Sequence, residues 1–184
     1  MKSTNLKIPE ILLLEPDIFE DERGFFYESF NQDKFEKVTG KKISFVQDNY
    51  SKSKKNTLRG LHYQLPPMAQ GKLVSVLQGE IFDVVVDLRK SSSTFGSFIY
   101  QELNALKQQQ LWVPEGFAHG FLVISDFAEV MYKTTNFYHP NSERSIIWND
   151  PDLSINWPNH SDILLSDKDK KASSFLDADS FIKF

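Results

Sequence analysis

The stretch LRGLHYQLPPMAQGKLVSVLQG (Leu58–Gly79) decides how the fold of this chain is read. Its second half, Leu73–Leu77, has the pattern of a short strand. Gly79 and Glu80 follow as a turn, and the apolar run Ile81–Leu88 predicts a second strand directly after it. Two strands joined this tightly indicate an all-β architecture. The first half of the stretch contains His62. Its role is interpreted below together with Lys72 and His119.

The rest of the chain continues the same pattern. A short helix is expected from Asn31 to Lys37, because Gly40 stands just past its end. A second helical segment is expected over about 166–184, since Ser166-Asp-Lys-Asp169 resembles a capping box. Many short strands separated by turn residues are typical of a sandwich or barrel. Such strands are predicted at 24–30, 44–49, 98–103, 110–113, 120–124, 128–134 and 145–148.

The composition limits the classes of function. With 184 residues and 40% hydrophobic content the chain fits a single globular domain, 1–184. A net charge of -4 argues against a general nucleic-acid binder, and the absence of cysteine excludes disulfides and thiolate metal sites. The N-terminal apolar run Ile11–Leu14 is too short for a signal peptide or a membrane span. We therefore expect a cytoplasmic protein that contacts neither membrane nor nucleic acid.

Two motifs resemble those of the cupin barrel, so we expect an antiparallel cupin, or jelly-roll, β-barrel with a few peripheral helices. The first motif is Gly60-Leu-His62-Tyr-Gln64 with Lys72, and the second is Pro114-Glu-Gly-Phe-Ala-His119. Metal-binding cupins place a second histidine and a glutamate where this chain has Gln64 and Lys72. An ammonium beside the two remaining histidines repels a cation, so no metal is expected.

Two histidines and a lysine suit removal of a proton next to a ketone. Such a C–H is roughly a dozen pK units less acidic than an imidazolium, a gap of about 16 kcal/mol that a base alone cannot bridge. Donors aimed at the enolate oxygen contribute on the order of 3 kcal/mol each. His62 as base, with Lys72 and His119 as oxyanion partners, makes a coherent set. The set needs no cofactor, but it lacks a proton donor for the opposite face.

An ordered series of segments resembles the dTDP-4-dehydrorhamnose 3,5-epimerase family. The resemblance runs from about residue 20 to about residue 170, nearly the whole chain. It is carried by RGFFYE (Arg23–Glu28), QDN (Gln47–Asn49), LRGLHYQ (Leu58–Gln64), GKLV (Gly71–Val74), FDVVVDLR (Phe82–Arg89), PEGFAHGF (Pro114–Phe121), YKTT (Tyr132–Thr135) and WNDP (Trp148–Pro151).

The resemblance implies inversion of carbons 3 and 5 in a dTDP-linked 4-keto-6-deoxyhexose. In that reading His62 is the general base, and Tyr132 is the acid on the other face of the sugar ring. Asp169 matches the aspartate that pairs with the base and fixes its tautomer. Tyr138 matches an aromatic that stacks on the thymine. The other matching substrate contacts are Arg23, Glu28, Gln47, Asp48, Asn49, Arg59, Lys72, His119, Glu143 and Lys168.

Relatives that epimerise only one carbon keep the same His, Lys and Tyr, so a single-carbon epimerase is an open alternative. A metal-dependent cupin or a non-catalytic sugar-binding module is the remote one. The family is commonly dimeric with N-terminal strands exchanged, and Ile8–Leu14 has the apolar content for this. The aromatic residues expected in the core are Phe25, Phe26, Phe82, Trp112 and Phe121.

Overall fold

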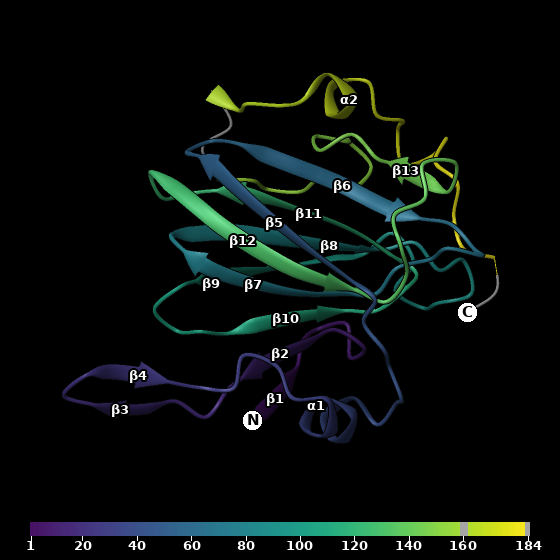
Figure 1. Cartoon of the computed structure of the whole chain (residues 1–184). Coiled ribbons are helices and arrows are strands. Elements are labelled where there is room, and N and C mark those ends of the chain that lie inside the picture. The colour runs from purple at the N-terminus through teal and green to yellow at the C-terminus, as the bar shows by residue number, and fades with distance from the viewer. Residues whose placement is uncertain (159–161, 183–184) are drawn as a thin grey trace.

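The computed structural model describes residues 1–158 and 162–182, and most of its regular structure is antiparallel strand (Figure 1). One sheet has the order β1 (Lys2–Asn5), β2 (Leu12–Glu15), β10 (Gln110–Val113), β7 (Lys72–Gln78), β12 (Phe127–Thr134) and β5 (Gln47–Lys54). We call it the first sheet. The second sheet has the order β13 (Glu143–Ser145), β6 (Leu58–Gln64), β11 (Phe117–Val123), β8 (Glu80–Asp87) and β9 (Phe98–Asn104).

The remaining elements lie outside these two sheets. The hairpin of β3 (Phe19–Asp21) and β4 (Gly24–Phe26) projects from the body of the molecule, at the left of Figure 1. The helices of the described residues are α1 (Gln32–Thr39) and α2 (Asp167–Lys170). The predicted all-β antiparallel class is confirmed. The described strands pair as two facing sheets without closing into a barrel.

Gly79 marks the corner where the chain passes from the first sheet to the second. It has φ +77°, and a Cβ at this position would lie 2.0 Å from the carbonyl oxygen of Phe127. Only glycine fits such a turn. The turn predicted from the sequence is therefore present, but its two flanking strands, β7 and β8, belong to different sheets.

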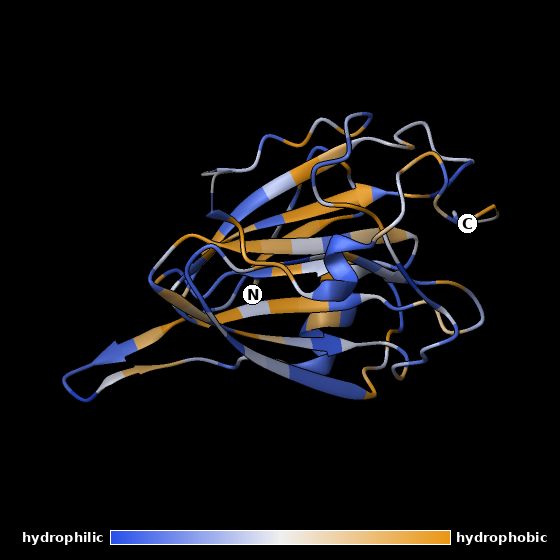
Figure 2. Ribbon diagram, turned by 90° about the horizontal axis from the view of Figure 1, so that it is seen from above, coloured by the Kyte–Doolittle hydropathy of each residue, from blue (hydrophilic) through white to orange (hydrophobic). Residues whose placement is uncertain are grey.

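The main core lies between the two sheets. It combines Val74 and Val130 of the first sheet with Val85 and Phe121 of the second. The outer face of the second sheet is covered as well, by a cluster that includes Trp157 from the C-terminal segment. β8 is covered on both faces, so its residues from Ile81 to Asp87 are all buried and most of them are apolar. Figure 2 shows this concentration of apolar residues on the strands of the body.

α1 begins and ends where local chemistry predicts. The side chain of Asn31 accepts a hydrogen bond from the Lys34 amide at 3.1 Å, and Gly40 closes the helix in the left-handed conformation. Phe35 is fully buried and packs edge-on against Trp112, with ring centroids 5.2 Å apart. The helix thus covers the outer face of the first sheet.

Two expectations were wrong. The segment 166–184 is helical only over α2, because the chain beyond it forms isolated bridges to distant residues: Ser173 to Ile146, and Phe181 to Arg89. These tertiary contacts outweigh the local preference for helix. Residues 183 and 184 of the predicted segment lie outside the described residues. Phe25 and Phe26 are not core residues but are 59% and 66% exposed on the hairpin.

Neither helix in the described part of the chain has the length and apolar content needed to cross a membrane.

Candidate active site

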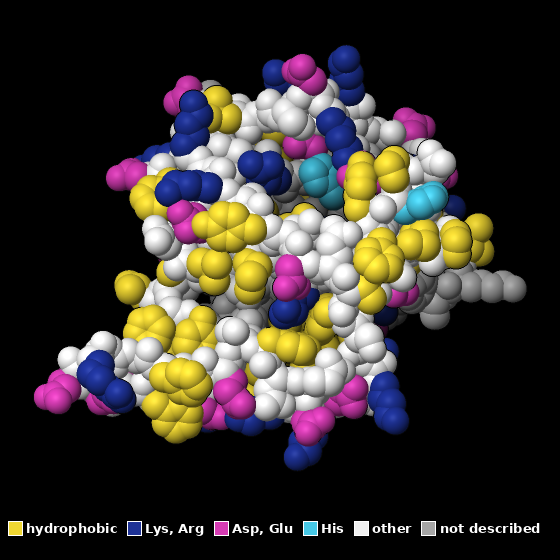
Figure 3. Space-filling view, in the orientation of Figure 1, with side chains coloured by type: hydrophobic (Ala, Val, Ile, Leu, Met, Phe, Trp, Pro, Cys, Tyr) yellow, Lys and Arg dark blue, Asp and Glu magenta, His cyan; other side chains and the backbone are white. Residues whose placement is uncertain are grey.

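A cavity of about 560 Å³ opens between the two sheets, beside β5 and β6. Figure 3 shows a histidine-coloured surface in this hollow, with lysine and arginine side chains around it. The first sheet contributes Asn49, Ser51, Lys72 and Tyr132 to its walls. The second sheet contributes Leu58, Arg59, His62, His119 and Phe121, and the segment that leads into α2 adds Leu164, Leu165, Ser166 and Asp169.

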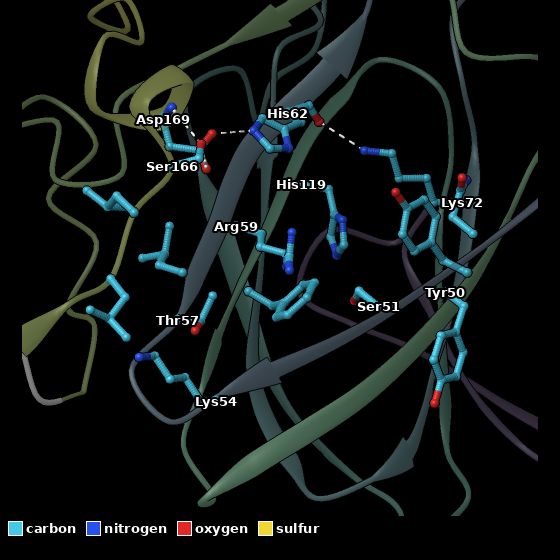
Figure 4. Close-up of a pocket in the computed structure, with 16 residues that line it drawn as sticks. Tyr50, Ser51, Lys54, Thr57, Arg59, His62, Lys72, His119, Ser166 and Asp169 are labelled. Carbon is cyan, nitrogen blue, oxygen red and sulfur yellow. Dashed lines mark hydrogen bonds and ion pairs between the residues drawn. The ribbon is translucent and has the colours of Figure 1, made fainter.

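His62 and Asp169 form a close pair although they are 107 residues apart in sequence (Figure 4). Nε2 of His62 lies 2.5 Å from Oδ1 of Asp169, which is buried. Neutral His62 therefore carries its proton on Nε2, and its basic lone pair is on Nδ1. Within the residues that the structure describes, Nδ1 has no hydrogen-bond partner.

Asp169 is placed by the first turn of α2. The hydroxyl of Ser166 accepts from the Asp169 amide at 3.1 Å and also donates to Oδ2 of Asp169 at 2.9 Å. Burial raises the pKa of Asp169, but the hydrogen bond and charge of His62, together with Ser166, outweigh it and lower the pKa below 3.8. The carboxylate is thus held ionised against the imidazole.

Lys72 is a buried cation in the wall opposite His62. Its Nζ donates to the carbonyl oxygen of His62 at 3.0 Å, and its side chain comes from β7 of the first sheet. Burial lowers the pKa of Lys72 from 10.5 to about 8, and the nearby charges of Asp83 and Glu143 oppose this change. The ammonium is therefore still mostly protonated at neutral pH.

His119 is held by a second carboxylate. Its Nε2 lies 2.9 Å from both oxygens of Asp83, which is fully buried on β8. Burial raises the pKa of Asp83, while the charge and hydrogen bond of His119 oppose the rise. Sequence reasoning did not single out Asp83. The signal was available, because a carboxylate inside the apolar run of β8 requires a buried partner.

Tyr132 faces His62 from the other sheet. It lies on β12, in register with Asn49 of β5 and Val74 of β7. Burial raises its pKa, and the charge of Arg59 opposes the rise. The phenol therefore keeps its proton at neutral pH. A ligand between the sheets would present one face to His62 and the other to Tyr132.

Polar groups on β5 and β6 line the same cavity. Arg59 Nε donates to Ser53 Oγ at 3.0 Å, which leaves the other guanidinium nitrogens available to a ligand. The hydroxyl of Ser51 is buried and has no hydrogen-bond partner among the described residues. In Figure 4, Arg59 lies beside His119, and Ser51 lies below both histidines. Sequence reasoning did not identify Ser51, because a serine in a strand carries no distinctive signal.

An adjoining cavity of about 210 Å³ shares His62, Lys72 and Tyr132 with the first. It is lined in addition by Gln47, Tyr138 and Glu143. The phenol of Tyr138 donates to Glu143 at 2.9 Å, and Glu143 also pairs with Lys168 of α2. The hydrogen bonds from Lys168 and Tyr138 hold the pKa of Glu143 below 4.5, against the effect of burial.

Three predicted site residues neither line the two cavities of this chain nor pair with a residue that lines them. Arg23 is exposed on the β3–β4 hairpin and pairs with Asp21. Glu28 pairs with Lys34, and Asp48 points outward to Lys133 at 3.0 Å. The other predicted site residues either line the cavities or, in the case of Lys168, pair with a residue that does.

Gln64 occupies the position at which a metal-binding cupin has its second histidine, and it has a structural role. Its side-chain amide donates to the carbonyl of Met68 at 2.6 Å and that of Phe137 at 3.2 Å, and its oxygen accepts from the His139 amide at 2.8 Å. In the described ranges, no cluster of three or more His, Asp or Glu side chains is placed to hold a metal ion.

Comparisons with known proteins find similar chains over nearly the whole length of this one. The family model for dTDP-4-dehydrorhamnose 3,5-epimerase matches residues 5–177. The chain is 57% identical to dTDP-4-dehydrorhamnose 3,5-epimerase of Shigella flexneri over 182 residues, covering 99% of this chain and all of the relative.

Solved structures are similar as well. A dTDP-6-deoxy-D-glucose-3,5-epimerase from Legionella pneumophila, in complex with dTDP-4-keto-L-rhamnose, superposes with a TM-score of 0.94. It is 48% identical and covers 100% of this chain and 98% of its own. A 3'-monoepimerase from Streptomyces bikiniensis, in complex with dTDP-quinovose, has a TM-score of 0.86 and 35% identity, covering 92% of this chain and 85% of its own.

Proposed function

The chain belongs to the dTDP-4-dehydrorhamnose 3,5-epimerase family, and we propose that it is an isomerase with that activity. It inverts carbons 3 and 5 of dTDP-4-dehydro-6-deoxy-D-glucose and yields dTDP-4-dehydro-L-rhamnose. The higher identity to double epimerases, 57% and 48%, than to the monoepimerase, 35%, favours inversion at both carbons.

The observation that carries the proposal is the position of two proton-transfer groups on opposite walls of one cavity. His62 comes from the second sheet and Tyr132 from the first. Epimerisation requires that a proton leave one face of the sugar ring and another arrive at the opposite face. A base and an acid on facing sheets meet this requirement without any movement of the sugar between steps.

In the proposed reaction, Nδ1 of His62 removes the proton from the carbon next to the 4-keto group. The electron pair of the broken C–H bond moves to the ketone oxygen and forms an enolate. Tyr132 then donates its phenolic proton to the opposite face of the same carbon, and the carbonyl re-forms. Solvent exchange restores both groups, and the cycle repeats at the second carbon.

The enolate oxygen needs positive charge and hydrogen-bond donors. Lys72 supplies a buried ammonium with donors beyond the one used by the His62 carbonyl. His119, held through Nε2 by Asp83, presents Nδ1 to the cavity, and this nitrogen donates to the enolate when both ring nitrogens carry protons. Such donors contribute on the order of 3 kcal/mol each to the stability of the transition state.

The nucleotide is bound next to the sugar. Arg59 binds the diphosphate, for which a guanidinium fork has the right geometry. Tyr138 stacks on the thymine in the adjoining cavity, where Gln47, Asn49 and Glu143 contact the nucleotide sugar. Lys168, which is paired with Glu143, contacts the nucleotide sugar from α2.

A homodimer accounts for Arg23, which lies outside the cavities of its own chain. The hairpin exposes Phe19, Phe25 and Phe26, each more than half accessible, and Figure 3 shows hydrophobic side chains gathered there. Exposed aromatics of this size mark an interaction surface. A second copy of the chain covers this hairpin and receives Arg23 at its substrate. Phe25→Ser with Phe26→Ser would then yield monomers in light scattering, whereas a dimer that persists would refute this interface.

Proton NMR in deuterated water with chelator tests the activity. We expect deuterium to enter dTDP-4-keto-6-deoxyglucose at carbons 3 and 5. Deuterium at one carbon only would identify a single-carbon epimerase, and no exchange would overturn the assignment of His62.

A further inference from the structure

Ser166 makes two hydrogen bonds to the same residue, and the second is not needed to cap a helix. As the N-cap of α2, its hydroxyl oxygen accepts from the Asp169 amide at 3.1 Å. The hydroxyl proton is donated to Oδ2 of Asp169 at 2.9 Å. Oδ1 of the same carboxylate is the oxygen that contacts His62. Each carboxylate oxygen thus has its own partner.

We propose that Ser166 is a positioning residue for the base, which acts through Asp169 to hold His62 in one tautomer. The inference rests on the proposed function, in which His62 removes the substrate proton. With Oδ2 fixed by Ser166, the carboxylate plane cannot turn about its Cβ–Cγ bond, and Oδ1 stays aimed at Nε2. Nδ1 is then left as the basic nitrogen that faces the cavity.

The other charged groups around His62 and Asp169 have partners of their own and do not hold the Asp169 carboxylate in place. The charged side chains that face Asp169 and His62 are Lys168 of α2, Glu143 of β13 and Lys72 of β7, with Arg59 on the cavity wall. Lys168 is paired with Glu143, and Lys72 donates to the His62 backbone. Among the described residues, Ser166 supplies the only side-chain hydrogen bond to Oδ2 of Asp169.

The chain contains a matched control for the capping role. Ser174 donates to Oδ2 of Asp177 at 2.7 Å and accepts from the Asp177 amide at 3.2 Å. This is the same Ser-x-x-Asp arrangement, eight residues further along the C-terminal segment. Asp177 is exposed and makes no contact with His62. Ser174→Ala therefore removes an equivalent turn-capping hydroxyl without touching the base.

The test compares Ser166→Ala, Ser166→Thr and Ser174→Ala by nitrogen-15 NMR of the histidine rings and by kcat/KM. His62→Asn identifies the His62 signal among the four histidines. For Ser166→Ala we expect mixed tautomers at His62 and a fall in kcat/KM of about fivefold to tenfold. The fall is no larger because Ser166 is exposed, so a water molecule can replace part of its hydrogen bond to Asp169. Ser166→Thr keeps a donor and restores the single tautomer, and Ser174→Ala changes kcat/KM by less than about twofold.

Ser166→Asp guards against a folding defect, since aspartate can cap the helix but has no proton to donate. It should mix the tautomers as Ser166→Ala does. A single Nε2–H tautomer in both variants would overturn the inference, as would equal losses in Ser166→Ala and Ser174→Ala. The ring signals need no substrate, so a wild-type protein without turnover would refute the proposed function and still leave the tautomer comparison decisive for Ser166.

Discussion

Lys72→Met should make the protein more stable and far less active. Because one pKa unit corresponds to about 1.4 kcal/mol, the fall in the pKa of Lys72 from 10.5 to about 8 represents roughly 3 kcal/mol of instability in the folded state at pH 7. Methionine removes this cost but leaves the His62 carbonyl without its donor, which costs about 1 kcal/mol. The expected net gain is about 2 kcal/mol in the free energy of unfolding.

The same pKa gives the wild-type protein a pH dependence whose sign is fixed. Between pH 8 and pH 10.5 the folded state has lost the Lys72 proton while the unfolded state retains it, so stability rises with pH in that window. Activity moves the other way. Since the ammonium stabilises the enolate, kcat/KM should fall about tenfold per pH unit above pH 8. Lys72→Met should lose on the order of 10²- to 10³-fold at pH 7.

Urea unfolding followed by tryptophan fluorescence measures the stability at fixed protein concentration, and deuterium exchange measures the activity. Lys52→Met is the control, because this lysine is also on the first sheet but has 62% of its side chain exposed. Its unfolding free energy should change by less than about 0.5 kcal/mol. A Lys72→Met protein less stable than wild type, or a wild-type kcat/KM that stays flat from pH 7 to pH 10, would show that Lys72 is not a destabilising, catalytic ammonium.

Three further predictions concern the dyad, the acid and the packing. Asp169→Asn should lower kcat by about 10²-fold or more with little change in KM, because the amide no longer fixes the His62 tautomer; a KM effect alone in steady-state kinetics would contradict this. Tyr132→Phe should slow the inversion of carbons 3 and 5 more than it slows the incorporation of deuterium at them. If NMR time courses show that both rates fall equally, Tyr132 does not act as a separate acid. Gly60→Ala should cost about 3 kcal/mol in thermal unfolding, since its Cβ would lie 2.5 Å from the Cα of Gly120. Gly24→Ala, also at positive φ but with open space around it, should cost much less, and equal losses would show that the contact is unimportant.

Local patterns in the sequence predicted what local chemistry determines. The helix start near Asn31, the glycine just past its end at Gly40 and the turn at Gly79 are each set by a few neighbouring residues, and each is present. The all-β class followed from the density of short strands. The capping serine at Ser166 was also visible, because it lies three residues before the aspartate that it contacts.

What could not be predicted depends on contacts far apart in the chain. Nothing near Asp83 shows that its partner is His119, 36 residues away. Phe25 and Phe26 have the apolarity of core residues, and only the three-dimensional path of the hairpin shows that they are exposed. The helix at Ser166 stops early because Ser173 pairs with Ile146, a preference absent from the local pattern.

The buried amide of Gln64 opposes any attempt to build a metal site into this chain. Gln64→His with Lys72→Glu would introduce the residue types of metal-binding cupins, but an imidazole cannot reproduce an amide that donates twice and accepts once. The carbonyl groups of Met68 and Phe137 and the amide of His139 would lose their hydrogen bonds to residue 64. Gln64 is only 3% exposed, so water could not easily replace it. At about 1–3 kcal/mol for each unsatisfied buried group, the loops around the cavity mouth would loosen before any cation could bind. A designer would have to rebuild these loops first and exchange the ligands second.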